Sequence, residues 1–258
     1  MEQVYLVVLS GGQDSTTCLW WAKRRWPDEK INTLTFDYGQ RHSKELEAAR
    51  IIATRAGVSH AYMTAAKLRG TSPLVSDTEL GKYEKIEDLP GGIEPTFIPG
   101  RNIMFLTLAA NYAMSLRQTP APAALHLVMG VCEADYGGYP DCRQSFLDMM
   151  QAALNEGIFG DPELGAVQLY APLMHLTKKQ SVELAASLGC LDELGYTHTC
   201  YEGGEKPCGQ CHACMIRARG FLEAKYPDPL YVRNGLDWPP PWAMRQTDEP
   251  LWYSGTPR

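Results

Sequence analysis

A glycine-rich turn near the start of the chain has the residue types of an anion-binding loop. Residues 9–15 read LSGGQDS and separate an apolar run from a helix-like segment. Glycines let a backbone pass close to a bulky anion, and the free N–H groups at a helix start attract negative charge. Ser10 and Ser15 add hydroxyl donors, and the GxxxxGK[ST] lysine is absent. The turn predicts an anion site; a simple strand-to-helix turn capped by Asp14 or Ser15 is the alternative.

Four cysteines within fifteen residues predict a metal site. Their spacing is C-x7-C-x2-C-x2-C, at Cys200, Cys208, Cys211 and Cys214. Four thiolates form a closed tetrahedral site without an open position, so the expected role is structural. The spacing favours zinc, and an iron–sulfur cluster is the alternative because thiolates also bind such clusters. The whole chain has eight cysteines, which in a cytosolic chain indicates metal binding or chemistry rather than disulfides.

Several charged residues follow apolar runs, where loops at the carboxyl ends of parallel strands bind ligands. Asp37 follows the second run, with capping of the next helix as the alternative. Arg101 precedes a long helix and predicts an anion clamp, because guanidinium matches phosphate and carboxylate oxygens. Residues 130–143 place Glu133 and Asp135 beside tyrosines, a set suited to the N–H edge and face of a guanine-like base. These last two and Asp37 are the candidate general bases.

Cationic side chains near the two later helices are further candidates. Lys178 follows a Pro-Leu pair at a predicted helix start, where its ammonium would meet a phosphate; a solvent-exposed lysine is the alternative. Arg217 and Arg219 follow the last cysteine. We expect them either to face phosphates or to lie on a solvated helix face.

The elements that must position these residues alternate between strand and helix. Apolar runs predict strands, and segments with helical periodicity predict helices, the last one beginning near Ala213. This alternation predicts an α/β fold with a doubly wound, mainly parallel sheet and a small C-terminal zinc-binding module. The expected domains are 1–189, 190–225 and an irregular Pro/Trp-rich tail at 226–258. The expected strands are 4–9, 32–36, 60–63, 125–131 and 169–173, and the expected helices are 14–25, 43–56, 103–115, 145–155 and 178–188.

Composition limits the class of protein. Hydrophobic residues make up 45% and charged residues 21%, which is ordinary for a globular protein and unlike a disordered one. A net charge of -6 argues against a general nucleic-acid binder. The N-terminus lacks the features of a secretory signal, and no apolar run approaches the roughly 18–20 residues of a membrane span. We therefore expect a cytoplasmic protein without direct nucleic-acid or membrane partners.

The string SGGQDSTTCLWWA resembles the PP-loop of the ATP pyrophosphatases, SGGxDS. Enzymes of that superfamily cleave ATP between its α and β phosphates and adenylate an oxygen of their substrate. The resemblance implies a PP-loop, or adenine nucleotide alpha hydrolase-like, fold. It also implies that the loop holds pyrophosphate through Ser10, Gly11, Gly12, Asp14 and Ser15, with Asp14 near Mg²⁺.

Six strings in order resemble the 7-cyano-7-deazaguanine synthase (QueC) family. They are SGGQDSTTCL, TFDYGQRH, FIPGRN, GVCEADYGGYPDCR, APLMHLTK and the cysteine segment, and they cover residues 1 to about 225. The resemblance implies conversion of 7-carboxy-7-deazaguanine, ammonia and ATP into the nitrile, with Mg²⁺ and one zinc ion per chain. The catalytic candidates are Ser10, Asp14 and Lys178, which match the family's motifs, together with the candidate general bases Glu133 and Asp135. The implied nucleotide-binding residues are Leu9, Ser10, Gly11, Gly12, Gln13, Asp14, Ser15, Thr16, Thr17, Cys18, Leu19, Asp37 and Arg101, and the implied zinc ligands are Cys200, Cys208, Cys211 and Cys214.

The resemblance also implies an oligomeric state and leaves an alternative activity open. Family members are commonly homodimers, so a homodimer is expected. QueC-like paralogues, some associated with antiphage defence, would activate the same carboxylate but join it to another amine, such as one on a protein. The tail after residue 225 and segment 65–96 do not match the family pattern.

Overall fold

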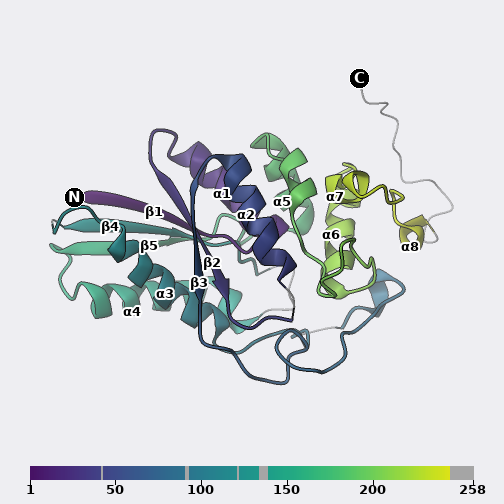
Figure 1. Cartoon of the computed structure of the whole chain (residues 1–258), viewed down its shortest axis with the longest axis horizontal. Coiled ribbons are helices and arrows are strands. Elements are labelled where there is room, and N and C mark those ends of the chain that lie inside the picture. Colours follow the sequence, from purple (N-terminus) through teal and green to yellow (C-terminus); the bar gives the residue numbers. More distant parts are fainter. Residues whose placement is uncertain (42, 91–92, 121, 134–138, 245–258) are drawn as a thin grey trace.

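A five-stranded parallel sheet organises the chain, which we describe from a computed structural model covering residues 1–41, 43–90, 93–120, 122–133 and 139–244. The strand order is β3-β2-β1-β4-β5, so the chain winds outward in both directions from β1, as predicted (Figure 1). All four strand pairs are parallel, with Tyr5 opposite both Ile31 and His126. The strands are β1 (Glu2–Val8), β2 (Ile31–Asp37), β3 (Ser59–Thr64), β4 (Ala123–Val128) and β5 (Gly165–Tyr170).

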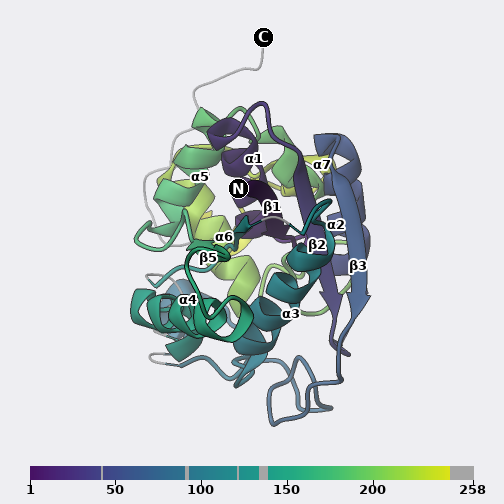
Figure 2. The same cartoon turned by 90° about the vertical axis from the view of Figure 1, so that its left-hand side faces the viewer.

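Helices cover both faces of this sheet, which explains why its central strands are buried almost throughout. One face is covered by α1 (Gln13–Arg25) and α2 (Lys44–Ala56), and the other by α3 (Arg101–Ser115) and α4 (Gln144–Ile158) (Figures 1 and 2). Each face has its own apolar core. None of the helices in the described ranges combines the length and apolar character that a membrane crossing requires.

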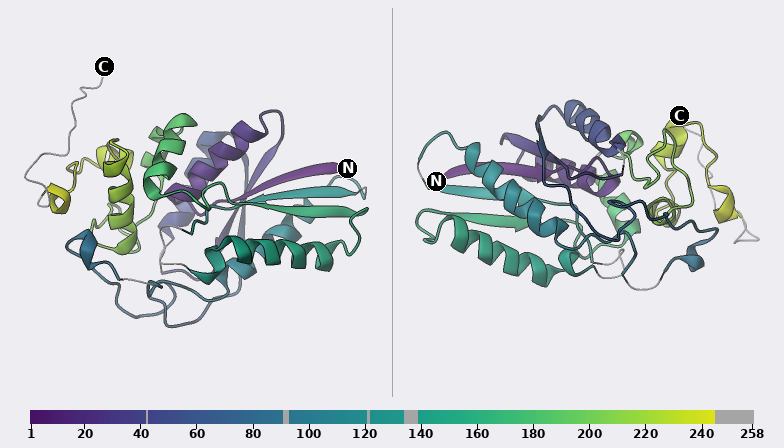
Figure 3. Two further views of the ribbon diagram at one scale, coloured as in Figure 1. Left: turned by 180° about the vertical axis from the view of Figure 1, so that it is seen from behind. Right: turned by 60° about the horizontal axis from the view of Figure 1, so that its bottom comes forward.

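The C-terminal part lies beyond the carboxyl ends of the strands (Figure 1; Figure 3 gives two further views). It comprises α5 (Lys178–Ser187), the 3-10 helix η3 (Asp192–Tyr196), α6 (His212–Glu223), α7 (Pro229–Arg233) and α8 (Pro241–Met244). Helices α5 and α6 pack together over a small core of Val182, Cys190 and Phe221. The tail is therefore not wholly irregular: it contains α7 and α8, and Trp238 packs edge-on against Phe221 and Tyr231.

The segment between β3 and α3 runs as a long connection along one side of the sheet. Among the described residues of this segment, the only helix is the 3-10 helix η1 (Ile86–Asp88). Tyr83 N–H donates to the carbonyl of Gln210, so this connection is attached to the C-terminal module. A second 3-10 helix, η2 (Pro140–Cys142), precedes α4.

Candidate active site and metal centre

The glycine-rich turn connects β1 to α1, as the sequence predicts. Gly12 is the N-cap of α1, and no side chain caps this end, so the alternative of capping by Asp14 or Ser15 is wrong. The first N–H groups of the helix thus have no intrahelical acceptor. The hydroxyl of Ser15 lies 3.0 Å from that of Ser10 and accepts the Ser10 N–H at 3.1 Å. These hydrogen bonds hold both hydroxyls at the N-terminus of α1.

Gly11 is required by close packing as well as by its backbone angle. Its φ is +85°, and a Cβ there would lie 2.7 Å from the backbone nitrogen of Ala49 and still closer to the carbonyl oxygen of Glu45. Only glycine lets α2 approach the turn this closely. Gly11 therefore lets the first turn of α2 lie beside the glycine-rich turn.

The turn opens on a cavity of about 220 Å³ at the carboxyl ends of β1, β2 and β4. Of the residues that the sequence proposes for the nucleotide, seven line this cavity: Leu9, Ser10, Gly12, Gln13, Asp14, Ser15 and Arg101. The other predicted residues with described positions do not line it; they are Gly11, Thr16, Thr17, Cys18, Leu19, Asp37, Glu133 and Lys178. Residue Asp135 lies outside the described residues.

The later residues of the predicted loop belong to the interior of α1. Thr16 and Thr17 are fully buried, and their hydroxyls donate to the carbonyls of Gly12 and Gln13. Cys18 and Leu19 are also fully buried in the core between α1 and the sheet. Their side chains support the helix that presents the anion loop.

Lys178 and Asp14 form an ion pair beside the cavity. The two carboxylate oxygens of Asp14 lie 3.0 and 2.9 Å from Lys178 Nζ, and both side chains are largely buried. Thr177 caps α5 in a reciprocal capping box with Gln180, which fixes Lys178 at the first helical position. The reading of Lys178 as a solvent-exposed lysine is therefore wrong. The ion pair with Asp14 holds the ammonium group of Lys178 beside the first turn of α1.

Arg101 lies at the cavity wall among polar groups that hold its guanidinium. Burial opposes its charge, but Tyr38 and Asp141 raise the pKa of Arg101 above its ordinary value. Asn102 donates to the carbonyl of Asp141 at 3.0 Å, which ties the start of α3 to η2. Arg101 Nε is buried without a hydrogen-bond partner among the described residues. The Nε–H group of Arg101 can therefore donate a hydrogen bond to an anionic ligand.

Asp37 and Glu133 lie apart from the cavity. The Asp37 carboxylate accepts a 2.6 Å hydrogen bond from Tyr62 and one from the Gly39 N–H, and these bonds lower its pKa. It does not cap α2, whose N-cap is Ser43. The side chain of Glu133 is 40% exposed and lies 3.6 Å from His175. The expectation that ligands bind at the carboxyl ends of parallel strands placed both residues at the correct edge of the sheet. It did not show that their side chains lie outside the cavity.

Neither expectation for Arg217 is correct, because this side chain is buried inside the C-terminal module. Its Nε and Nη2 donate to the two oxygens of Asp228 at 2.7 and 2.8 Å. Its remaining N–H groups reach Thr197, Thr199 and the carbonyl of Leu194, so all five donors are used. Arg219 is partly exposed and lies 3.8 Å from Glu223. Arg217 thus joins η3, α6 and α7 rather than binding a ligand.

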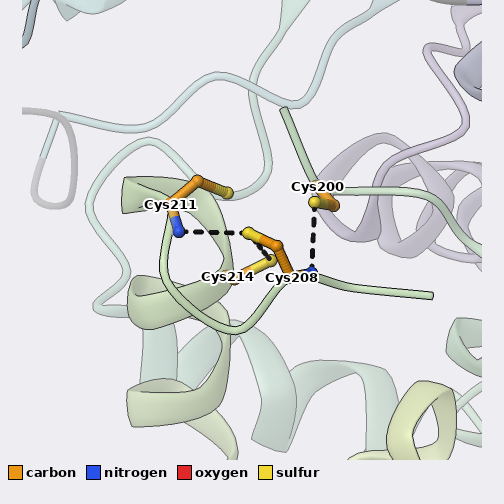
Figure 4. Close-up of side chains that lie close together, drawn as sticks. All are labelled: Cys200, Cys208, Cys211 and Cys214. Carbon is orange, nitrogen blue, oxygen red and sulfur yellow. Dashed lines mark hydrogen bonds between the residues drawn. The ribbon is translucent and has the colours of Figure 1, made fainter. Parts of the chain in front are cut away.

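The four predicted metal ligands converge. Their Sγ atoms all lie within 4.8 Å of one another, and Cys200, Cys211 and Cys214 are buried (Figure 4). Backbone N–H groups of Gln210 and Cys211 donate to Cys208 Sγ, and that of Cys208 donates to Cys200 Sγ. Hydrogen bonds from the other cysteines lower the pKa of Cys208. Donors aimed at these sulfurs favour thiolates, the form that binds a metal ion.

The metal module also forms one wall of the cavity, which the sequence did not predict. His198, Thr199, Tyr201 and Ala213 all line it. The His198 N–H donates to the carbonyl of Gly11 at 2.9 Å, and His198 Nε2 lies 2.9 Å from the carbonyl of Cys200. Only Thr199 lies between His198 and Cys200, the first cysteine of the cluster. The four-cysteine cluster is therefore connected through His198 to the backbone of the glycine-rich turn.

Glu45 is a further cavity residue that the sequence did not point to. It lies in the first turn of α2 and lines the cavity with Tyr38 and Arg101. In the string KELEAAR it is one of several charged helix residues, and only its tertiary surroundings distinguish it.

Comparisons with known proteins point to one family. Residues 4–225 match the model described as "Queuosine biosynthesis protein QueC". The chain is similar to proteins named 7-cyano-7-deazaguanine synthase: it is 50% identical to that of Gloeobacter violaceus over 88% of this chain and 94% of the relative. The Chromobacterium violaceum relative is 46% identical over 90% of this chain and 94% of its own. The Laribacter hongkongensis relative is 44% identical over 88% and 94%.

Proposed function

Because this chain belongs to the QueC family of queuosine biosynthesis, we propose that it converts 7-carboxy-7-deazaguanine, ammonia and ATP into 7-cyano-7-deazaguanine. The named relatives all carry the synthase name, so the comparisons give no support to the paralogue that would join the deazapurine to another amine. The observation that carries the proposal is the cavity itself. It combines the SGGQDS turn with Arg101 and an apolar wall at the carboxyl edge of a parallel sheet.

The reaction requires activation of oxygen atoms that are poor leaving groups. Adenylation bonds a carboxylate oxygen to the α-phosphorus of ATP and releases pyrophosphate. Ammonia then attacks the carbonyl carbon and that oxygen leaves as part of AMP, which gives the primary amide. A second adenylation, on the amide oxygen, lets that oxygen leave as AMP and the nitrile form. Positioning of ATP and stabilisation of phosphate charge would supply most of the catalysis.

The residues of the cavity have chemistry suited to this sequence. The N–H groups at the start of α1, with the hydroxyls of Ser10 and Ser15, would hold pyrophosphate. Lys178 and Arg101 would offset the charge of the phosphates. The Asp14 carboxylate is the ligand type that Mg²⁺ prefers, and when bound the ion would neutralise developing phosphate charge.

We propose a single zinc ion for the cysteine centre. Four sulfurs at about 2.3 Å from one ion would lie about 3.8 Å apart, and the Cys208 and Cys214 sulfurs are 4.0 Å apart. An iron–sulfur cluster would hold its ligands farther apart, because several iron and sulfide atoms lie between them. The ion would stabilise the module that forms the cavity wall. We further propose that the enzyme is a cytoplasmic homodimer that uses free ammonia and makes no direct contact with nucleic acid.

Incubation with 7-carboxy-7-deazaguanine, ATP, Mg²⁺ and ammonium tests the function. Mass spectrometry should detect the nitrile, together with AMP and pyrophosphate. Asp14→Asn should abolish turnover, whereas Asp28→Asn, a matched change of an exposed aspartate after α1, should leave it unchanged. Accumulation of the amide without any nitrile from the wild-type protein would contradict the proposal.

A further inference from the structure

Two acidic residues line the cavity within the described part of the chain: Asp14 and Glu45. Asp14 is paired with Lys178 at 2.9 Å. Glu45 accepts no hydrogen bond from another described residue, and the positive charge that acts on it is that of Arg101. It is therefore the carboxylate of the cavity whose oxygens are free to meet a ligand.

Glu45 is partly buried in the wall of the cavity. Its backbone carbonyl lies against Gly11, which fixes the first turn of α2 beside the anion loop. Tyr38 faces it from the segment after β2, and Arg101 faces it from α3. On its own helix, Lys44 is bonded to Glu205 and lies 3.8 Å from Glu47, outside the cavity. Burial raises the pKa of Glu45 to about 7, and Arg101 opposes this rise.

Other polar groups of the same cavity are donors. Gln13 is 3% exposed, and its Nε2 has no hydrogen-bond partner among the described residues. Arg101 Nε is also buried without one. These donors suit the acceptor-rich oxygens of an adenylate. Glu45 differs from these groups because its carboxylate can accept a proton, which a guanidinium or a side-chain amide N–H cannot do.

The proposed reaction needs such an acceptor. When ammonia attacks the adenylated carboxylate, a C–N bond forms, the C–O bond to AMP breaks, and one proton leaves the nitrogen. On the way from amide to nitrile both N–H protons leave the nitrogen. The last departs as AMP takes the C–O electron pair and the N–H electron pair becomes part of the C≡N bond.

We propose that Glu45 is the general base that accepts these protons from the substrate nitrogen, one at a time, and returns each to water between steps. This inference rests on the proposed function. A base works best when its pKa is near the working pH, which Glu45 satisfies near neutrality. Of the bases considered from the sequence, Asp37 and Glu133 are less suitable, because Asp37 is bonded to Tyr62 and Glu133 lies outside the cavity. The third, Asp135, lies outside the described residues.

The amide-to-nitrile half-reaction gives the sharpest test, since it needs no ammonia and so is not confused by the titration of ammonium. The purified full chain would be mixed with the primary amide of 7-carboxy-7-deazaguanine, ATP and Mg²⁺ in single-turnover experiments from pH 5.5 to pH 9. Pyrophosphate release reports adenylation, and nitrile formation reports the proton-removing step. Glu45→Gln keeps the shape of the side chain but cannot accept a proton.

We expect Glu45→Gln to slow nitrile formation by about 10²- to 10⁴-fold while pyrophosphate release stays close to that of wild type. The wild-type nitrile rate should fall as the pH drops below 7, and this acid limb should disappear in the variant. Glu45→Asp should recover part of the rate. Glu47→Gln, on the exposed side of the same helix turn, is the matched control and should behave as wild type.

Two results would overturn the assignment of Glu45. One is a Glu45→Gln variant that forms nitrile at the wild-type rate. The other is a parallel loss of pyrophosphate release and nitrile, which would assign Glu45 to nucleotide binding. A wild-type protein that makes no nitrile would instead refute the function itself. Thermal unfolding of each variant, together with the wild-type pH profile, keeps the test decisive even for a variant that folds poorly.

Discussion

Gly220 in α6 offers a sharp test of how the C-terminal module positions Lys178. A Cβ at this position would lie 3.0 Å from Lys178 Cβ and 3.1 Å from its carbonyl carbon, and closer still to Cγ. The lysine stem therefore crosses α6 where glycine leaves room. We expect Gly220→Ala to push Lys178 away from the Asp14 carboxylate.

The expected magnitude follows from two opposing effects. Overpacking a tight site typically costs about 1–3 kcal/mol, whereas replacing a helical glycine by alanine gains about 0.5–1 kcal/mol. The net loss in the free energy of unfolding should be about 0.5–2 kcal/mol. Turnover should fall by about 10²-fold, because a displacement near 1 Å of a positioning group has that effect.

Gly157→Ala is the matched control, since a Cβ at Gly157 in α4 would meet nothing within 4 Å. It should stabilise the protein by about 0.5–1 kcal/mol and leave turnover unchanged. Urea unfolding followed by tryptophan fluorescence measures the stabilities, and the amide-to-nitrile assay measures turnover. Stability changes of the same sign in both variants, or full activity in Gly220→Ala, would refute the packing argument.

Three further predictions concern burial, metal and pH. Arg217→Met should destabilise the protein by about 3–5 kcal/mol in urea, because Asp228 is left buried without its partner, while Arg219→Met should change stability by less than about 0.5 kcal/mol; equal effects would contradict the buried network. Cys211→Ser, or removal of metal with a chelator, should eliminate one bound zinc ion per chain by elemental analysis and weaken ATP binding in calorimetry, because His198 connects the module to Gly11; unchanged metal content would disprove the ligand assignment. The pKa of Glu45 is raised to about 7, so the folded protein binds more protons than the unfolded chain between about pH 4.5 and 7, and the free energy of unfolding falls as the pH rises through that window. Glu45→Gln should therefore be more stable than wild type at pH 8, by about 1–3 kcal/mol, but not at pH 4. A stability difference that is independent of pH would show that this carboxyl is not desolvated.

Much of the site could be read from short strings because its geometry is local. The SGGQDS turn follows a strand and starts a helix, and Ser10 and Ser15 are only five positions apart, so a short stretch of chain brings its hydroxyls and N–H groups together. The cysteine spacing likewise confines four sulfurs to one tight turn and the start of α6. The alternation of strands and helices predicted the parallel sheet, since the hydrophobic periodicity of each element is itself local.

Residues far apart in the sequence could not be assigned in this way. Asp14 and Lys178 are separated by 164 positions, and only the packing of α5 against α1 makes them partners. Asp37 follows the right strand, but its orientation depends on Tyr62 of the neighbouring strand. Arg217 has the residue type of a phosphate ligand, yet burial of Asp228 gives it a structural role.

By itself, the sequence determined the family, the glycine-rich turn between a strand and a helix, the cluster of four cysteines and the class of fold. All of these depend on residue types at short spacings. Only the tertiary structure decided which charges are paired and which remain available, because burial and distance set the cost of each charge. Glu45 illustrates the difference: its sequence neighbours suggest an ordinary surface glutamate, and the surrounding cavity makes it a carboxyl that titrates near neutral pH.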